Sequence, residues 1–348
     1  MHVLVAIWSA AVILAGTALL WMTSLILLRF LHERRETQRR ADRRLVEQAL
    51  VGVLQGRRDI AAELGRYRHR GRLLAEVLLD FITIVRGADR QIVVEALESF
   101  GADHALRARV THGSLAGRLS AVEALGAFSG AATRAALHAA ADRGPSNLRL
   151  AALRSLIQAG GTVTVGALLD DVAGGVLPLS GPLAELLQLT VEADHAAAGQ
   201  ALGRTDLPPA ARILLLDALG SSGDYELIPL LTGHLASPRG DTRAAAVRAL
   251  GKMKHPSSGA ALGRALGDPD WDVRSAAAQA IGEVRLTGLL DELAQRLADP
   301  VWRVRFDAAA ALVKFGPPGL ERLRDAAAGS NDAPRRAAAL TLAELGSA

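Results

Sequence analysis

The fold is decided by two stretches near the C-terminal end: residues 268–282 read DPDWDVRSAAAQAIG, and residues 299–316 read DPVWRVRFDAAAALVKFG. Both contain, in the same order and at the same spacing, an Asp-Pro pair, then Trp, then Val-Arg and a run of alanines. Proline interrupts a helix, whereas alanine has the highest helix propensity of all residues. Each stretch therefore predicts a turn followed by a helix, and the pair predicts a repeat.

The 31-residue period that relates these stretches extends through most of the chain. Arg149 and Arg118 continue the register of a C-terminal arginine column, and the residue seven positions after each arginine is apolar. Gly181 stands where an arginine is expected, so the unit in residues 160–207 has diverged. A fixed period of this length indicates units that bury their faces only against their neighbours. The C-terminal column consists of Arg212, Arg243, Arg274, Arg305 and Arg336.

Each unit is predicted to contain two helices. Residues 224–236 are apolar at helical spacing, Ser237-Pro238 interrupts them, and a second helix follows over about 241–252. The same arrangement is expected in residues 258–284 and 289–315. The sequence thus predicts an all-α solenoid of about eight helix pairs over residues 73–348.

The quoted stretches resemble the bacterial HEAT-repeat motif, in which an Asp-Pro turn leads to Val-Arg and an Ala-rich second helix. The resemblance is clearest over 208–346, less complete over 88–160 and weakest over 160–207. Asp206, Asp268 and Asp299 each precede a column arginine by the Asp-to-Arg spacing that is typical of the family. HEAT arrays use these positions as a hydrogen-bonded ladder between repeats. The resemblance therefore implies a structural rather than a phosphate-binding role for Asp206, Arg212, Arg243, Asp268, Arg274, Asp299, Arg305 and Arg336.

The N-terminal segment is predicted to cross a membrane. Residues 3–28 carry no charged side chain, and a helix of that length reaches roughly 39 Å against about 30 Å of hydrocarbon. A cleaved signal peptide is the competing interpretation, but it would have a shorter apolar stretch, a basic start and a small-residue cleavage site. We therefore expect an uncleaved transmembrane helix in residues 1–30.

A basic juxtamembrane helical segment is expected over residues 31–72. Residues 29–72 hold 13 Arg against six acidic residues, so the positive-inside rule places them and the solenoid in the cytoplasm, with the N-terminus outside. The Ala-, Arg- and Gly-rich composition suggests a bacterial genome, hence the inner membrane. Two interpretations, a topology determinant and a contact with anionic lipid headgroups, stay open for Arg34, Arg35, Arg39, Arg40, Arg43 and Arg44.

Composition argues against several functions. The chain has no cysteine, and no histidine pair has metal-ligand spacing, so neither a metal site nor a cofactor is expected. Residues 73–348 carry 27 basic and 30 acidic residues; because nucleic-acid binding needs a continuous basic surface, no such partner is expected. HEAT-like enzymes that attach bilins or excise damaged bases exist, but no residue set for either chemistry is present.

We therefore expect a membrane-tethered, non-catalytic scaffold or adaptor that binds a protein partner, itself membrane-associated. The family's bacterial setting suggests a membrane enzyme complex such as a polysaccharide-synthesising glycosyltransferase. The candidate partner-binding residues are Arg248 and the tryptophans Trp271 and Trp302, which are one period apart and which also fit a packing role over the inter-helix turn. Two alternatives remain: a regulator or sensor acting through its membrane helix, and a HEAT-like enzyme with a site in the diverged segment, residues 160–207.

Overall fold

The computed structural model describes residues 101–346, together with residues 21–24, 29, 34, 41, 43–46, 48, 94 and 98. The described residues form helices and turns and no strand, which confirms the all-α prediction for this part of the chain. The chain divides into two compact units. Unit 1 comprises residues 1–143 and 158–160, and unit 2 comprises residues 144–157 and 161–348.

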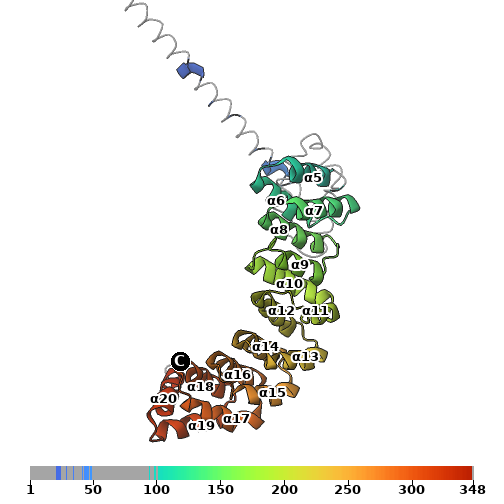
Figure 1. The fold of residues 1–348 in the computed structure, drawn as a ribbon. Coiled ribbons are helices and arrows are strands. Elements are labelled where there is room, and N and C mark those ends of the chain that lie inside the picture. Colours follow the sequence, from blue (N-terminus) through green and yellow to red (C-terminus); the bar gives the residue numbers. More distant parts are fainter. Residues whose placement is uncertain are drawn as a thin grey trace, which may run out of the picture. The chain divides into compact units, whose positions relative to one another are not determined.

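Unit 1 contains three fully described helices: α5 (Ala102–His112), α6 (Leu115–Leu125) and α7 (Ala131–Arg143) (Figure 1). Helix α6 begins where the Ser114 hydroxyl accepts a hydrogen bond from the Gly117 N–H, which satisfies one of the free donors of the first turn. Helix α5 packs against both α6 and α7. The side chains of Leu106, Leu125 and Leu137 are buried in this unit.

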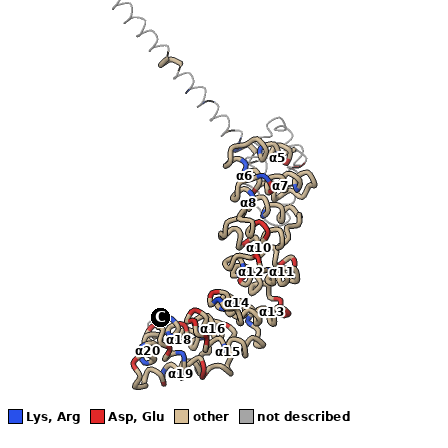
Figure 2. Tube along the Cα trace, in the orientation of Figure 1, with Lys and Arg blue, Asp and Glu red and all other residues tan. Residues whose placement is uncertain are grey.

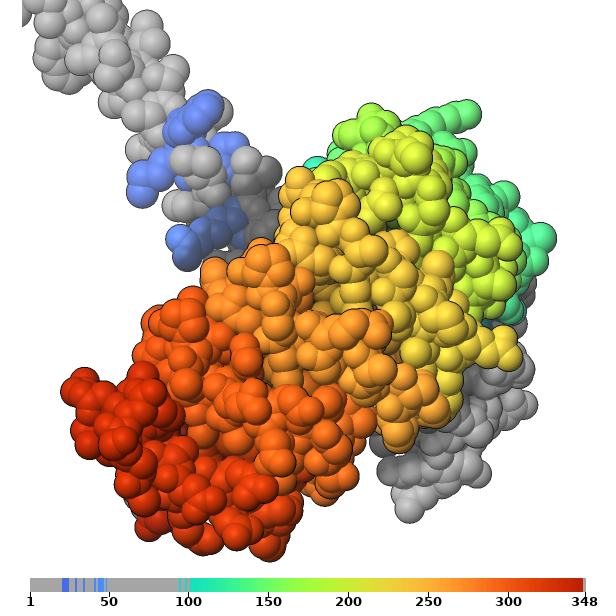
Figure 3. All heavy atoms as spheres, turned by 60° about the horizontal axis from the view of Figure 1, so that its bottom comes forward, coloured from blue at the N-terminus to red at the C-terminus, as the bar shows by residue number. Residues whose placement is uncertain are grey.

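Unit 2 is a stack of helix pairs. Helices α10, α12, α14, α16, α18 and α20 pack against one another in succession, and shorter helices lie between them in the sequence (Figure 1). Figure 3 shows the later repeats as one closely packed body, coloured from yellow to red. This arrangement is a HEAT-like α-solenoid. Its helices are α8 (Ser146–Gln158), α9 (Val165–Ala173), α10 (Gly181–Ala193), α11 (His195–Ala201), α12 (Pro209–Ser221), α13 (Ile228–Gly233), α14 (Gly240–Met253), α15 (Gly259–Ala265), α16 (Trp271–Val284), α17 (Leu290–Gln295), α18 (Trp302–Val313), α19 (Pro317–Ala328) and α20 (Asp332–Gly346).

The first helix of several pairs is shorter than the sequence predicts. Residues 224–236 form the short helix α13 between two 3₁₀ turns, η2 (Tyr225–Leu227) and η3 (His234–Ala236). Pro229 sits in the first turn of α13, where its missing N–H costs nothing. The other 3₁₀ turns are η4 (Pro256–Ser258), η5 (Thr287–Leu289) and η6 (Arg296–Ala298).

Glycines in the second helices allow neighbouring repeats to approach closely. A Cβ atom added to Gly251 of α14 would lie 2.7 Å from the Ala280 Cβ of α16. One added to Gly282 of α16 would lie 2.8 Å from the Ala311 Cβ of α18. Both distances are shorter than carbon atoms tolerate, so the Gly-Ala pairing that recurs with the period of the repeat sets the spacing of these helices.

Helix α14 ends in a left-handed residue. Lys254 has φ 51°, and its N–H donates to the carbonyl of Gly251. Arg285 closes α16 with φ 58°. This conformation is unfavourable for side chains with a Cβ, and it is normally taken by glycine at helix ends.

The predicted transmembrane helix (1–30) and the juxtamembrane segment (31–72) lie outside the described residues, apart from the few positions named above. Of the predicted membrane-interface residues, Arg34, Arg43 and Arg44 are described, and all three are helical and exposed. Among the helices of the described part, none is both long and apolar enough to cross a bilayer. The membrane anchor therefore stays a prediction.

Candidate functional site

Two of the column arginines, Arg243 and Arg274, connect successive repeats. Arg243 donates from Nε and Nη2 to the two carboxylate oxygens of Asp268, both at 2.8 Å. Arg274 does the same with Asp299, at 2.8 and 3.0 Å. The Nη1 of each arginine donates to the carbonyl oxygens of the turn that precedes its own helix. One guanidinium thus fixes its own turn with one edge and holds the aspartate of the next repeat with the other.

These pairs are shielded from solvent. The side chain of Asp299 is 1% exposed and that of Arg274 is 11% exposed. Burial by itself raises the pKa of Asp299, but hydrogen bonds from Arg274 and from the Val301 N–H lower it, and the resulting pKa lies below the ordinary value. The pKa of Arg274 is raised, chiefly by its hydrogen bond to Asp299. Bidentate charge-assisted pairs of this kind are strong and geometrically specific, which suits a structural connection.

The ladder is incomplete at its N-terminal end. Arg212 donates to the carbonyl oxygens of Leu202 and Arg204 and not to that of Asp206. The carboxylate of Asp206 instead accepts from the side chain of Arg204, next to it in the turn and exposed. The predicted pairing through Asp206 is therefore wrong, because Gly181 stands 25 residues before Asp206, at the position from which Arg243 and Arg274 reach their aspartates.

The ladder also stops at its C-terminal end. Arg305 donates from Nη1 to the carbonyl oxygens of Asp299 and Pro300. Ser330 stands at the following ladder position, where Arg243 and Arg274 find an aspartate. Arg336 pairs with Asp332 of its own helix at 3.4 Å, so it does not extend the ladder as predicted.

The two candidate tryptophans open successive second helices. Trp271 is the first residue of α16 and Trp302 the first residue of α18. Their side chains are 46% and 64% exposed, respectively. The third candidate, Arg248 on α14, makes an exposed ion pair with Asp272 at 3.4 Å. We call Trp271 and Trp302 the tryptophan edge.

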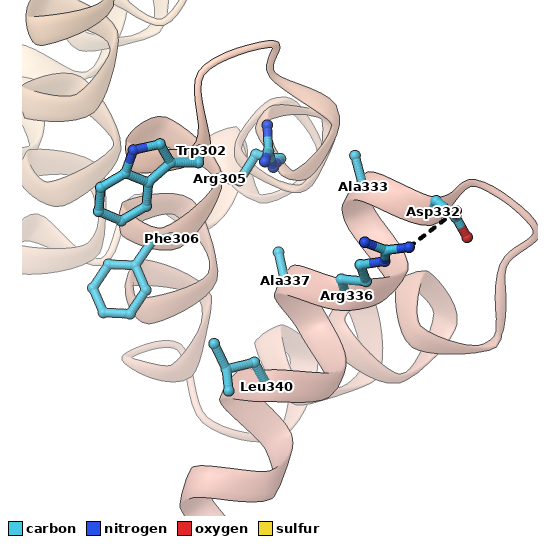
Figure 4. A pocket seen from close by; sticks show the side chains of 8 residues that line it. All are labelled: Trp302, Arg305, Phe306, Asp332, Ala333, Arg336, Ala337 and Leu340. Carbon is cyan, nitrogen blue, oxygen red and sulfur yellow. Dashed lines mark hydrogen bonds and ion pairs between the residues drawn. The ribbon is translucent and has the colours of Figure 1, made fainter.

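A pocket of about 530 Å³ lies between α18 and α20, next to this edge. Figure 4 shows Trp302 and Phe306 on one side and Ala333, Ala337 and Leu340 on the other. Its volume is in the range of small-molecule and side-chain binding sites. The remaining lining residues are Arg305, Asp332 and Arg336.

The Gly-Ala pairing of the earlier second helices is not continued between α18 and α20, the helices that border the pocket. One period after Gly282 stands Val313, and one period after Ala311 stands Leu342. Both are partly buried at the edge of the core. The glycine and alanine that let α16 and α18 approach closely are thus replaced by larger side chains at the equivalent positions of α18 and α20.

Sequence reasoning identified Trp302, Arg305 and Arg336 but missed Phe306 and Leu340. Both missed residues are large, apolar and exposed, at 39% and 55%. Phe306 occupies the position of Ser275 and Ala244 in earlier repeats, so a comparison of the repeats position by position was the available signal. Only the structure shows that Leu340 faces Phe306 across the pocket.

The diverged segment, residues 160–207, folds into α9, α10 and α11. Its clearest ionic group is exposed: Arg204 bridges Asp170 at 2.7 Å and Asp206 at 2.6 Å. Thr190 is a buried polar residue of this segment, and its hydroxyl donates to the carbonyl of Leu187. Within the described residues no group of three or more His, Cys, Asp or Glu is placed to hold a metal ion.

Charges of both signs are interspersed along unit 2 (Figure 2). Lys252 pairs with Asp217 at 2.5 Å across successive second helices, and Arg154 pairs with Glu185 at 2.9 Å. Binding to a polyanion requires a continuous field of one sign, which such alternation does not produce.

Comparison with known proteins identifies the repeats. Residues 196–280 and 260–343 match the family model described as HEAT repeats, so this part of the chain carries HEAT repeats. No match was found among curated proteins.

Several solved structures are similar to this chain. Kap121p bound to Nup53p is 14% identical with a TM-score of 0.43, and the likeness covers 86% of this chain and 41% of that one. The complex of CpcE and CpcF of phycocyanin lyase from Nostoc sp. PCC7120 is 20% identical with a TM-score of 0.29, covering 72% and 92%. An engineered protein is 17% identical with a TM-score of 0.35, covering 89% and 95%. The chain thus spans about two fifths of the Kap121p length, and these likenesses concern the fold alone.

Proposed function

We propose that this chain, which carries HEAT repeats over residues 196–343, is a non-catalytic scaffold that holds a protein partner at a membrane. Residues 1–30 form its anchor in this proposal, and unit 2 presents the binding surface in the cytoplasm of a bacterial cell. HEAT solenoids are typical of protein-interaction scaffolds, because an extended stack of repeats exposes a large surface for its mass.

The tryptophan edge is the observation that supports a binding role best. A tryptophan that only covered a turn would bury most of its ring, yet Trp302 is 64% exposed and Trp271 is 46% exposed. Large aromatic side chains left in water are unfavourable in a free protein, and they are enriched among residues that dominate binding energy at interfaces. Phe306 and Leu340 extend the apolar surface from the edge into the pocket.

A membrane anchor would allow a small binding surface to hold the partner. The uncharged residues 3–28 are long enough to cross a bilayer, and the 13 arginines of residues 29–72 orient them. A scaffold confined to the membrane meets a membrane-resident partner at raised effective concentration. A membrane enzyme complex, such as one that contains a polysaccharide-synthesising glycosyltransferase, is the partner class that the bacterial setting suggests.

Site-specific photo-crosslinking in living cells tests the binding surface. A benzophenone amino acid replaces Trp302 or Trp271 in the full-length chain, and the matched control carries it at Leu179, which is exposed between α9 and α10. We expect one membrane protein to be captured from both tryptophan positions and not from the control. Equal capture at all three positions, or none, would refute the proposal.

The anchor is tested separately. Leu14→Arg places a charge in the centre of the apolar segment, whereas Leu14→Ile leaves its hydropathy nearly unchanged. We expect the first variant to leave the membrane fraction under alkaline carbonate and the second to stay. Replacing residues 3–28 with an unrelated membrane helix should preserve crosslinking; its loss would favour a regulator that acts through the helix itself.

A further inference from the structure

We propose that the pocket between α18 and α20 binds an extended segment of the partner in which an acidic side chain stands next to a bulky apolar residue. This inference rests on the proposed function, and it names the chemistry that the scaffold recognises. Arg305 receives the carboxylate, and Trp302, Phe306 and Leu340 receive the apolar side chain.

Arg305 differs from Arg243 and Arg274 in the partners of its guanidinium group. In Arg243 and Arg274 the Nε and Nη2 atoms hold an aspartate of the next repeat. Arg305 uses Nη1 for the same two turn carbonyls as its counterparts. No residue in the described part of the chain accepts from its Nε or Nη2. The edge that binds a carboxylate in Arg243 and Arg274 is therefore presented again by Arg305, which lines the pocket.

The chain's own acidic groups do not complete this site, as far as the described residues extend. Ser330 occupies the ladder position and is exposed. The carboxylate in the pocket lining, that of Asp332, is turned to its own helix, where it accepts from Arg335 and Arg336 (Figure 4). Arg336 adds a second cation to the lining, and its side chain is 78% exposed.

Apolar surface surrounds this charged corner. Phe306 and Leu340 face each other across the pocket, and Trp302 stands beside Arg305. The volume of about 530 Å³ accommodates a leucine or phenylalanine side chain together with a carboxylate. An acidic residue alone would leave the apolar side chains of the pocket exposed to water. An apolar residue alone would bury the donors of Arg305 without a hydrogen-bond acceptor, which is unfavourable in free energy.

Charge complementarity selects a partner's segment as the occupant. Residues 29–72 of this chain carry a net charge of +7, so the basic segment next to the membrane would be repelled by Arg305 and Arg336. An acidic segment of another protein is attracted. The geometry of Arg243 and Arg274 shows that an aspartate side chain fits the guanidinium edge.

Peptide binding to the purified full-length protein in detergent tests the inference. The probe is a fluorescent peptide with blocked termini and a central Leu-Asp-Phe sequence, measured by polarisation. The control peptide carries Asn in place of Asp. We expect the Asp peptide to bind at least about tenfold more tightly, because a hydrogen-bonded charge is lost in the control.

Substitutions locate the site without disturbing the core. Ser330→Asp supplies an internal carboxylate to Arg305 and should weaken peptide binding about tenfold, whereas Ser330→Asn should not. Phe306→Ala should weaken binding of both peptides, and Leu345→Ala, on the same helix as Leu340 and outside the pocket, should change neither. Unchanged helical content by circular dichroism shows that each variant is folded.

Several results would overturn the inference. Equal binding of the Asp and Asn peptides, or indifference to Ser330→Asp and Phe306→Ala, would remove the carboxylate site. Equal affinity for a peptide whose sole carboxylate is its C-terminus would refute a side-chain ligand, and complete displacement by millimolar inorganic phosphate would indicate a general anion site. In each case crosslinking from Trp271 and Trp302 would still support the scaffold, so failure of the pocket is separate from failure of the proposed function.

Discussion

Removing the carboxylate of Asp299 should loosen the junction between α16 and α18. Asp299→Ala deletes both hydrogen bonds from Arg274 and the acceptor of the Val301 N–H at 2.9 Å. The Arg274 side chain, 11% exposed, is then left with one edge unpaired. Breaking a buried ion pair from one side costs about 3–5 kcal/mol. We expect a loss of that order in local stability.

An exposed pair provides the matched control. Asp272 lies close by on α16, where it meets Arg248 at 3.4 Å, and the two side chains are 43% and 42% exposed. Solvent screens such a pair, so Asp272→Ala should cost about 0–1 kcal/mol.

Hydrogen exchange is the suitable assay, because repeat arrays open locally and the exchange of each amide reports the stability of its own helix. The full-length variants are compared through the protection of amides in α16 and α18. Comparable losses in Asp299→Ala and Asp272→Ala would refute the structural importance of the ladder. In a double-mutant cycle, Arg274→Ala and Asp299→Ala should be strongly coupled because they share one ion pair, although Arg274→Ala also removes the Nη1 hydrogen bonds to the carbonyl oxygens of Asp268 and Pro269.

The same pair makes stability depend on pH. The pKa of Asp299 is lower in the folded protein than the value of about 3.9 in an unfolded chain. Its contribution is therefore fully present above about pH 4, and it is lost as the pH falls through the lower, folded value. Protection of α18 measured on a descending pH series should fall less steeply in Asp299→Asn than in the wild type. Parallel profiles would contradict this assignment.

Three further substitutions test the packing, the helix ends and the tryptophan edge. Gly251→Ala places a Cβ 2.7 Å from that of Ala280 and should destabilise the protein by about 1–3 kcal/mol. Its control, Gly233→Ala, has open space around the new Cβ and should stabilise α13 by about 0.5–1 kcal/mol. Equal shifts in melting temperature for the two variants would contradict the role of the close approach. Lys254→Gly relieves a left-handed residue at φ 51° and should raise the melting temperature, by an amount equivalent to about 1 kcal/mol; a lower melting temperature would show that the lysine side chain stabilises the helix end. Trp302→Ala should leave the melting temperature nearly unchanged because this residue is 64% exposed, and it should abolish partner crosslinking from position 271; a large loss of stability would favour a packing role.

Much of the fold could be predicted because the same local sequence pattern recurs in several repeats. Trp271 and Trp302 begin α16 and α18, as the Asp-Pro turns before them predict. Arg243 and Arg274, two members of the arginine column, form the ladder pairs with Asp268 and Asp299. Each of these arginines contacts a backbone carbonyl of the turn in its own repeat and a carboxylate of the next repeat. The spacing in the sequence predicts that arginine and aspartate are close, but it does not distinguish these two contacts.

The sequence by itself determined the period, the helical class, the charge balance and the positions of the Asp-Pro turns, because these depend on local propensity and on a spacing that recurs. Only the tertiary structure decided that one edge of Arg305 finds no acceptor among the described residues, that Phe306 and Leu340 meet across a pocket, and that both tryptophans keep much of their rings exposed. These features depend on how α18 and α20 pack, and at their equivalent positions Val313 and Leu342 replace the Gly-Ala pair of the earlier helices. The physical reason is that this pocket lies where the repeat pattern changes, and what such a change exposes is set by packing in three dimensions.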